Sequence, residues 1–159
     1  MILGMPPFVF IHVLISLLGI GSGIVVLLGF FGDKRLGDWT NFFLGTTILT
    51  SVTGFFLPAH KLLPSHILGI LSLIALAIAC VARYSKRMQG GWRPTYVITA
   101  MISLYFNVFV LIAQSFMKVP ALHALAPTGS ESPFAVAQGL NFLLFMILTI
   151  FAVKNFRAA

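Results

Sequence analysis

The stretch FVFIHVLISLLGIGSGIVVLLGFF, residues 8–31, decides the fold of this chain, and it contains no Asp, Glu, Lys or Arg. An α-helix needs about 20 predominantly apolar residues to cross the hydrocarbon core of a bilayer. In lipid, backbone N–H and C=O groups cannot bond to water, and a helix satisfies them within one segment. The stretch therefore predicts a transmembrane helix.

Four further apolar runs follow, so that the predicted spans are residues 8–31, 39–57, 65–82, 96–117 and 134–153. Of the 159 residues, 59% are hydrophobic and only 8% are charged, whereas soluble domains carry roughly 25% charged residues. The runs are too continuous for the alternation of membrane β-strands. We expect a single all-α integral membrane domain, a bundle of five transmembrane helices.

The basic residues indicate the orientation of the bundle. The formal net charge is +7, and alternate connectors carry most of the Lys and Arg, namely Lys34, Arg35, Arg83, Lys86, Arg87, Arg93, Lys154 and Arg157. The other side holds only Lys61 and Lys118. Since cytoplasmic loops are enriched in Lys and Arg, we expect the N-terminus outside and the C-terminus in the cytoplasm, in an inner (plasma) membrane of bacterial type. Topology explains the positive charge without nucleic acid as a partner.

The connector RYSKRMQGGWR, residues 83–93, is also a candidate site for lipid headgroups. Basic side chains beside a membrane attract anionic lipids at about 1 kcal/mol each, and four lie here: Arg83, Lys86, Arg87 and Arg93. The alternative is that topology alone accounts for them. Rings that suit the interface fall at the same cytoplasmic ends, namely Trp39, Tyr84, Trp92 and Tyr96.

Small and polar residues share one face of the first span, where His12, Ser16, Gly19 and Gly23 recur at helical spacing. Glycines four residues apart let another helix approach closely, so Gly19 and Gly23 predict a helix-packing groove. The alternative is a flat surface against which a planar cofactor or a lipid lies. On the second span, we expect the hydroxyls of the threonine face to bond to carbonyls of their own helix.

A polar interior is predicted from the last two spans, which carry Ser103, Asn107, Gln114, Gln138 and Asn141. Amide side chains in lipid require hydrogen-bond partners, although each interhelical bond contributes only about 0.6–2 kcal/mol. We therefore expect these two spans to face each other or a shared interior. A sharper alternative is a polar permeation path lined by the same residues.

The histidines suggest a cofactor. The segment LPAHKLLPSH, residues 57–66, is the predicted external connector between the second and third spans, and it contains His60 and His66. The expected topology places His12 on the same side. We expect the rings to bond to water or headgroups at the interface. The alternative is a b-type haem, which two imidazoles on different helices can ligate, with His12 and His66 as ligands and His60 in reserve.

No catalytic or metal motif accompanies the histidines. The only cysteine, Cys80, lies inside an apolar run and cannot form an intrachain disulfide. Asp33 and Asp38 are expected on the opposite side of the membrane from the histidines, so they cannot complete a Ser-His-Asp arrangement with them. The sequence therefore favours a non-enzymatic protein.

Three stretches carry a resemblance to a known family: FIHVLISLLGIGSG (10–23), DKRLGDWTNFFLGTTILTSVTGF (33–55) and GGWRPTYVITAMISLYFNVFVL (90–111). They resemble the small uncharacterised bacterial multi-span membrane proteins of the DUF2306 type. The resemblance implies a membrane topology and no settled activity. Proteins of that type usually have a histidine near the start of the second helix, where this chain has Asp38, Trp39 and Asn41.

From these patterns we expect an accessory subunit, or a module that binds a ligand, lipid or cofactor. Its partners would be membrane lipids and either a larger membrane complex or further copies of the chain. One alternative is a membrane cytochrome that passes electrons between quinone and an external acceptor. Another alternative is a small transporter or channel.

Overall fold

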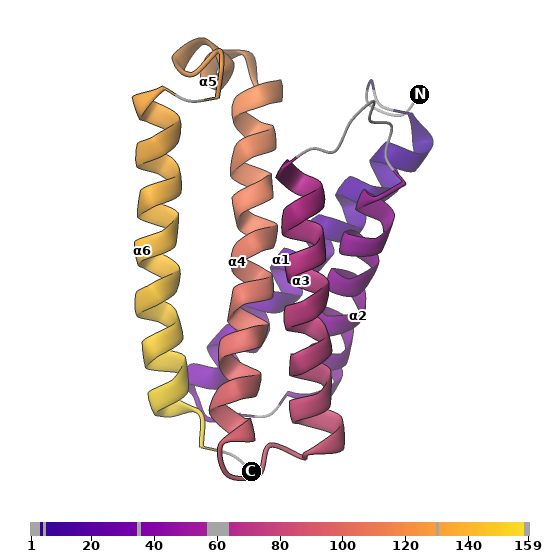
Figure 1. Cartoon of the computed structure of the whole chain (residues 1–159), viewed down its shortest axis with the longest axis vertical. Coiled ribbons are helices and arrows are strands. Elements are labelled where there is room, and N and C mark those ends of the chain that lie inside the picture. The colour runs from indigo at the N-terminus through magenta and orange to yellow at the C-terminus, as the bar shows by residue number, and fades with distance from the viewer. Residues whose placement is uncertain (1–3, 5, 35, 57–63, 130, 158–159) are drawn as a thin grey trace.

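The computed structural model describes residues 4, 6–34, 36–56, 64–129 and 131–157, and it confirms the all-α prediction for them. Figure 1 shows the helices in chain order: α1 (Pro7–Phe31), α2 (Gly37–Gly54), α3 (Pro64–Cys80), the π-helical turn η1 (Val81–Ser85), α4 (Trp92–Lys118), α5 (Pro120–Leu125) and α6 (Ser132–Asn155). Each predicted span corresponds to one long helix of the structure.

Four helices in the described part of the chain are long and apolar enough to cross a membrane, and they occupy Pro7–Phe31, His66–Ser85, Trp92–Lys118 and Ser132–Asn155. Many of their large apolar side chains are exposed, for example Leu28 on α1 and Leu140 on α6. Lipid is the solvent in which such a surface is stable. The 18-residue α2 is more polar, since it contains Asp38 and Asn41.

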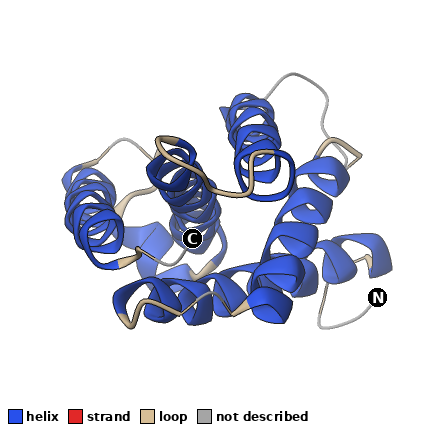
Figure 2. Ribbon diagram, turned by 90° about the horizontal axis from the view of Figure 1, so that it is seen from below, coloured by secondary structure: helices blue, strands red, loops and turns tan. Residues whose placement is uncertain are grey.

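The helices form one bundle in which α1 packs along α2 and also contacts α4 and α6. In turn, α3 packs between α2 and α4, and α6 lies against α4 and α1. Figure 2 shows this arrangement from one end, with α6 at the edge of the bundle. The contact between α4 and α6 agrees with the expectation that the last two spans face each other.

The hydrophobic core is concentrated at the end of the bundle where α1, α3 and α6 finish and α4 begins (Figure 1). Three rings form its centre: Phe30 lies edge-on to Tyr96 with centroids 5.8 Å apart, and Phe156 lies 4.9 Å from Phe30. Tyr96 is fully buried, so its expected place at the membrane interface was wrong. Helix α4 begins four residues earlier than predicted, which carries Tyr96 one turn into the bundle.

Two polar contacts join helix ends and a connector at this core. Arg93 donates from Nη1 to the carbonyls of Val153 and Phe156 at the end of α6. The backbone N–H of Arg157 donates to Asp33 Oδ1 at 2.8 Å. The end of α6 is thereby tied to the start of α4 and to the connector after α1.

Candidate functional site

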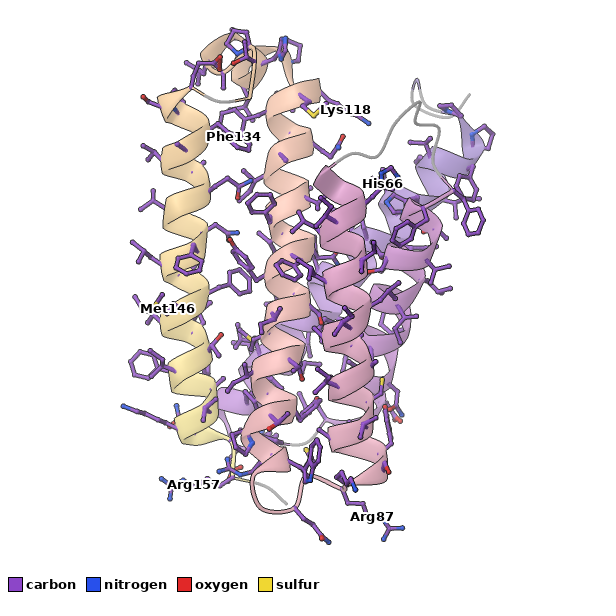
Figure 3. The ribbon with its side chains drawn as sticks, in the orientation of Figure 1. His66, Arg87, Lys118, Phe134, Met146 and Arg157 are labelled. Atoms are coloured by element: carbon purple, nitrogen blue, oxygen red, sulfur yellow. The ribbon has the colours of Figure 1, made fainter. Side chains whose placement is uncertain are left out.

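A cavity of about 340 Å³ lies between α1, α2, α3 and α4, at the end of the bundle remote from the core. Figure 3 shows His66 and Lys118 at this end, with Arg87 and Arg157 at the other. The cavity wall runs along α4 from Phe106 to Lys118, which is about 18 Å at a rise of 1.5 Å per residue. Its volume is within the usual range of small-ligand pockets, roughly 300–1,000 Å³.

The wall combines apolar and polar side chains. Apolar groups come mainly from α1 and α4, and they include Val9, Val13, Phe106, Val110 and Leu111. Small residues of α2 and α3 line the opposite side, where bulkier side chains would fill the space: Ser51, Gly54, Gly69 and Ser72. Nitrogen-bearing side chains also line the cavity, namely His12, His66, Asn107, Gln114 and Lys118.

Three hydroxyl groups of the wall are committed to their own helices. Ser16 donates to Val13 O at 2.7 Å, Thr50 to Thr46 O at 2.8 Å and Ser115 to Leu111 O at 2.7 Å. Such bonds satisfy a hydroxyl in an apolar environment without another helix. Because each hydroxyl has a single hydrogen, these groups offer a ligand only their acceptor lone pairs.

His12 is oriented by the end of α2. Its Nδ1 lies 2.7 Å from Thr53 Oγ1, and the Thr53 hydroxyl donates to Leu49 O at 2.6 Å. Since Thr53 has given its hydrogen to Leu49, its oxygen accepts from the Nδ1–H of His12. In neutral His12 the other ring nitrogen, Nε2, then carries the lone pair and can accept a proton or bind a metal.

His66 lies beside the same helix end. Its ring is stacked on Phe55, with centroids 5.7 Å apart and an interplanar angle of 26°. His12 lies close to the same helix end. A Cβ atom added to Gly54, the residue before Phe55, would lie 3.6 Å from His12 Cε1. The end of α2 therefore positions both imidazoles on the wall of one cavity, whereas His60 lies outside the described residues and His123 is exposed on α5.

The predicted polar interior divides into separate parts. Asn107 and Gln114 line the cavity. Ser103 is buried and donates to Thr99 O at 3.0 Å on its own helix. On α6, Gln138 donates from Nε2 to Phe109 O at 3.0 Å, and Asn141 is also buried. Only α4 thus contributes polar residues of this set to the cavity.

Gly19 and Gly23 lie where α2 and α4 meet α1. A Cβ atom on Gly23 would lie 2.6 Å from Leu104 Cδ1 and 2.9 Å from Phe43 Cε1. A Cβ atom on Gly19 would lie 3.3 Å from Asn107 Nδ2 and from Thr47 Oγ1. Side chains of the neighbouring helices therefore cover this face, which leaves no room there for a planar cofactor.

The predicted headgroup cluster is engaged mostly within the protein. Arg83 lies over the rings of Tyr84 and Tyr96, 5.7 and 5.5 Å from their centroids. Lys86 lies 5.7 Å from the centre of the Trp92 ring. Arg93 is bound to the end of α6, and the exposed Arg87 points away from the bundle (Figure 3).

Lys118 is the cavity residue that sequence reasoning missed, because it was counted only as one of two basic residues on the minor side. A signal was present: Asn107, Gln114 and Lys118 recur at i, i+7 and i+11, which places them on one face of a helix. Among the described residues, no group of three or more His, Cys, Asp or Glu could hold a metal ion. Comparisons with protein families, curated proteins and solved structures found no match.

Proposed function

We propose that this protein is an integral membrane module that binds an amphipathic ligand in the cavity between α1 and α4. The observation that carries the proposal is the cavity itself, in which α1, α3 and α4 bring polar nitrogen groups into a largely apolar wall. A concave apolar site with a few convergent polar groups is the usual form of a ligand-binding pocket. Binding of this kind suits either an independent module or an accessory subunit of a larger complex.

The proposed setting is a bacterial-type inner membrane, with α2 as a fifth span. Helix α2 runs beside α1 and α3 through the bundle (Figure 1). With the N-terminus outside, the basic connectors after α1 and α3 and the tail after α6 lie in the cytoplasm, in accord with the positive-inside rule. The cavity then faces the outer side of the membrane.

A cavity-filling variant tests the proposal. Val110 is half-buried on α4 and lines the cavity, whereas Val136 is 59% exposed on α6. We expect Val110→Trp to abolish retention of a copurified amphiphile, measured by native mass spectrometry of the full chain, while Val136→Trp retains it. Equal retention by both variants, or no retained ligand in the unaltered protein, would contradict the proposal.

Haem is a second candidate ligand, favoured by the two imidazoles on one cavity wall. The bond from His12 Nδ1 to Thr53 is of the kind that fixes the tautomer of a metal-binding imidazole. A reduced-minus-oxidised visible spectrum of the purified protein tests this. An α band lost in both His12→Ala and His66→Ala would support ligation, and a flat spectrum from protein made with ample haem would contradict it.

A further inference from the structure

We infer that the cavity selects an anionic amphiphile, with an acyl chain along α4 and a carboxylate or phosphate head beside Lys118. This inference rests on the proposed function, since it names the class of ligand for the same cavity. It is carried by the distribution of charge around the cavity and by the length of the mostly apolar wall that ends at Lys118.

The charge at the mouth of the cavity has no acidic counterpart. Lys118 is exposed at the end of α4, and no Asp or Glu lines the cavity. The whole chain has only three acidic residues, and Asp33 and Asp38 lie in or beside the connector between α1 and α2, at the opposite end of the bundle. An ammonium group at the rim of an apolar cavity favours a negatively charged partner.

Glu131 is the only acidic residue at the same end, and it is already bound. Its carboxylate accepts hydrogen bonds from the N–H of Thr128 at 3.0 Å and from the Thr128 hydroxyl. In the part of the chain that the structure describes, no carboxylate forms an ion pair with Lys118. The lysine is therefore available to an anion that enters from the membrane interface.

The cation of the wall lies at one end of it. Phe106, Asn107 and Val110 lie deep on α4, Gln114 lies one turn further out, and Lys118 lies at the rim. Figure 3 shows Lys118 and His66 together at this end of the bundle. A mostly apolar wall that follows α4 for about 18 Å and ends at a cation matches a single acyl chain with an anionic head better than a compact neutral molecule.

Equilibrium binding to the full chain in phosphatidylcholine nanodiscs tests the inference. Three probes share one acyl chain and differ in the head: oleate, 1-oleoyl lysophosphatidate and monooleoylglycerol. We expect oleate, lysophosphatidate or both to bind about tenfold more tightly than the neutral glyceride. Whichever anion shows this preference identifies the head as a carboxylate or a phosphate.

Lys118→Gln should remove that preference by lowering the affinity for the anionic probes toward that for monooleoylglycerol. Lys154→Gln removes one positive charge at the opposite end of the bundle, and it should keep the preference.

Equal affinity for all three probes would overturn the anionic selectivity while the proposed function stands. Retention of the preference by Lys118→Gln would also overturn the role of Lys118 in selectivity while the proposed function stands, because the lysine would then only reach to bilayer headgroups. If none of the probes binds the unaltered protein, the selectivity inferred here is overturned; the proposed function itself is judged by ligand retention in Val110→Trp and Val136→Trp.

Discussion

At the scale of single residues, the absence of a side chain at Gly23 sets how closely α2 and α4 approach α1. We expect Gly23→Ala to lower the free energy of unfolding by about 1–3 kcal/mol, as overpacking of a tight core does. The added Cβ would lie 2.6 Å from Leu104 and 2.9 Å from Phe43, and both side chains are 1% exposed. Denaturant titration in detergent micelles measures the change.

Gly21→Ala is the matched control, because Gly21 lies on the same helix with no atom within 4 Å of an added Cβ. This substitution should be neutral or slightly stabilising, since alanine favours a helix over glycine by up to about 1 kcal/mol. If both variants lose stability equally, the loss would come from the helix itself and not from its packing against Leu104 and Phe43.

Glu131, the only glutamate, gives a prediction that depends on pH. The hydrogen bond from the Thr128 hydroxyl, followed by the bond from its N–H, lowers the pKa of the Glu131 carboxyl. The turn is therefore stabilised above the ordinary pKa of glutamate, and this contribution is lost as the pH falls through the lowered pKa of the folded protein. We expect Thr128→Val to return the pKa of Glu131 part of the way toward its ordinary value.

A carbon NMR titration of protein labelled at glutamate measures this pKa from a single carboxyl signal. Thr95→Val is the control, since the Thr95 hydroxyl donates to Gly91 O on α4 and is remote from Glu131. An unchanged pKa in Thr128→Val would show that the hydroxyl does not stabilise the carboxylate.

At the scale of elements, Arg93 determines how α6 is attached to the bundle. It joins the start of α4 to the last carbonyls of α6, and hydrogen bonds to a charged group typically contribute about 1.5–3 kcal/mol. We expect Arg93→Met to destabilise the protein by about that amount and to increase hydrogen exchange at the end of α6. Arg87→Asn should have little effect, because Arg87 is exposed and asparagine tolerates its positive φ of 52°.

The elements were more predictable than the site that they build. Apolar runs located the long helices to within a few residues, because the length of hydrocarbon to be crossed determines both the run and the helix. Hydropathy does not distinguish a helix bonded at i+4 from one bonded at i+5, so the π turn Val81–Ser85 was not foreseen. Spacing placed Lys118 on the helix face of Asn107 and Gln114. The cavity depends on which faces meet, so spacing alone could not show that this face and the small residues of α3 line one cavity.

At the scale of the whole molecule, the bundle has two unlike ends. Close packing around Phe30, Tyr96 and Phe156 joins the ends of α1 and α6 to the start of α4 at one of them. At the other, α1 to α4 enclose the cavity, whose wall includes His12, His66, Gln114 and Lys118. A tightly packed end that holds the helices together allows the opposite end to keep an open, ligand-sized space, at the side that we propose faces outward.

The orientation and the number of spans can be tested together by labelling single cysteines with a membrane-impermeant maleimide in a Cys80→Ala background. If α2 crosses the membrane, Lys34→Cys and Arg87→Cys both face the cytoplasm and react only after permeabilisation. His123→Cys on α5 should react in intact cells.

If α2 stays on one side, the connectors that hold Lys34 and Arg87 lie on opposite sides, and one of these two cysteines reacts in intact cells. Labelling of both in intact cells, with protection of His123→Cys, would instead retain five spans and invert the bundle, which would turn the cavity toward the cytoplasm.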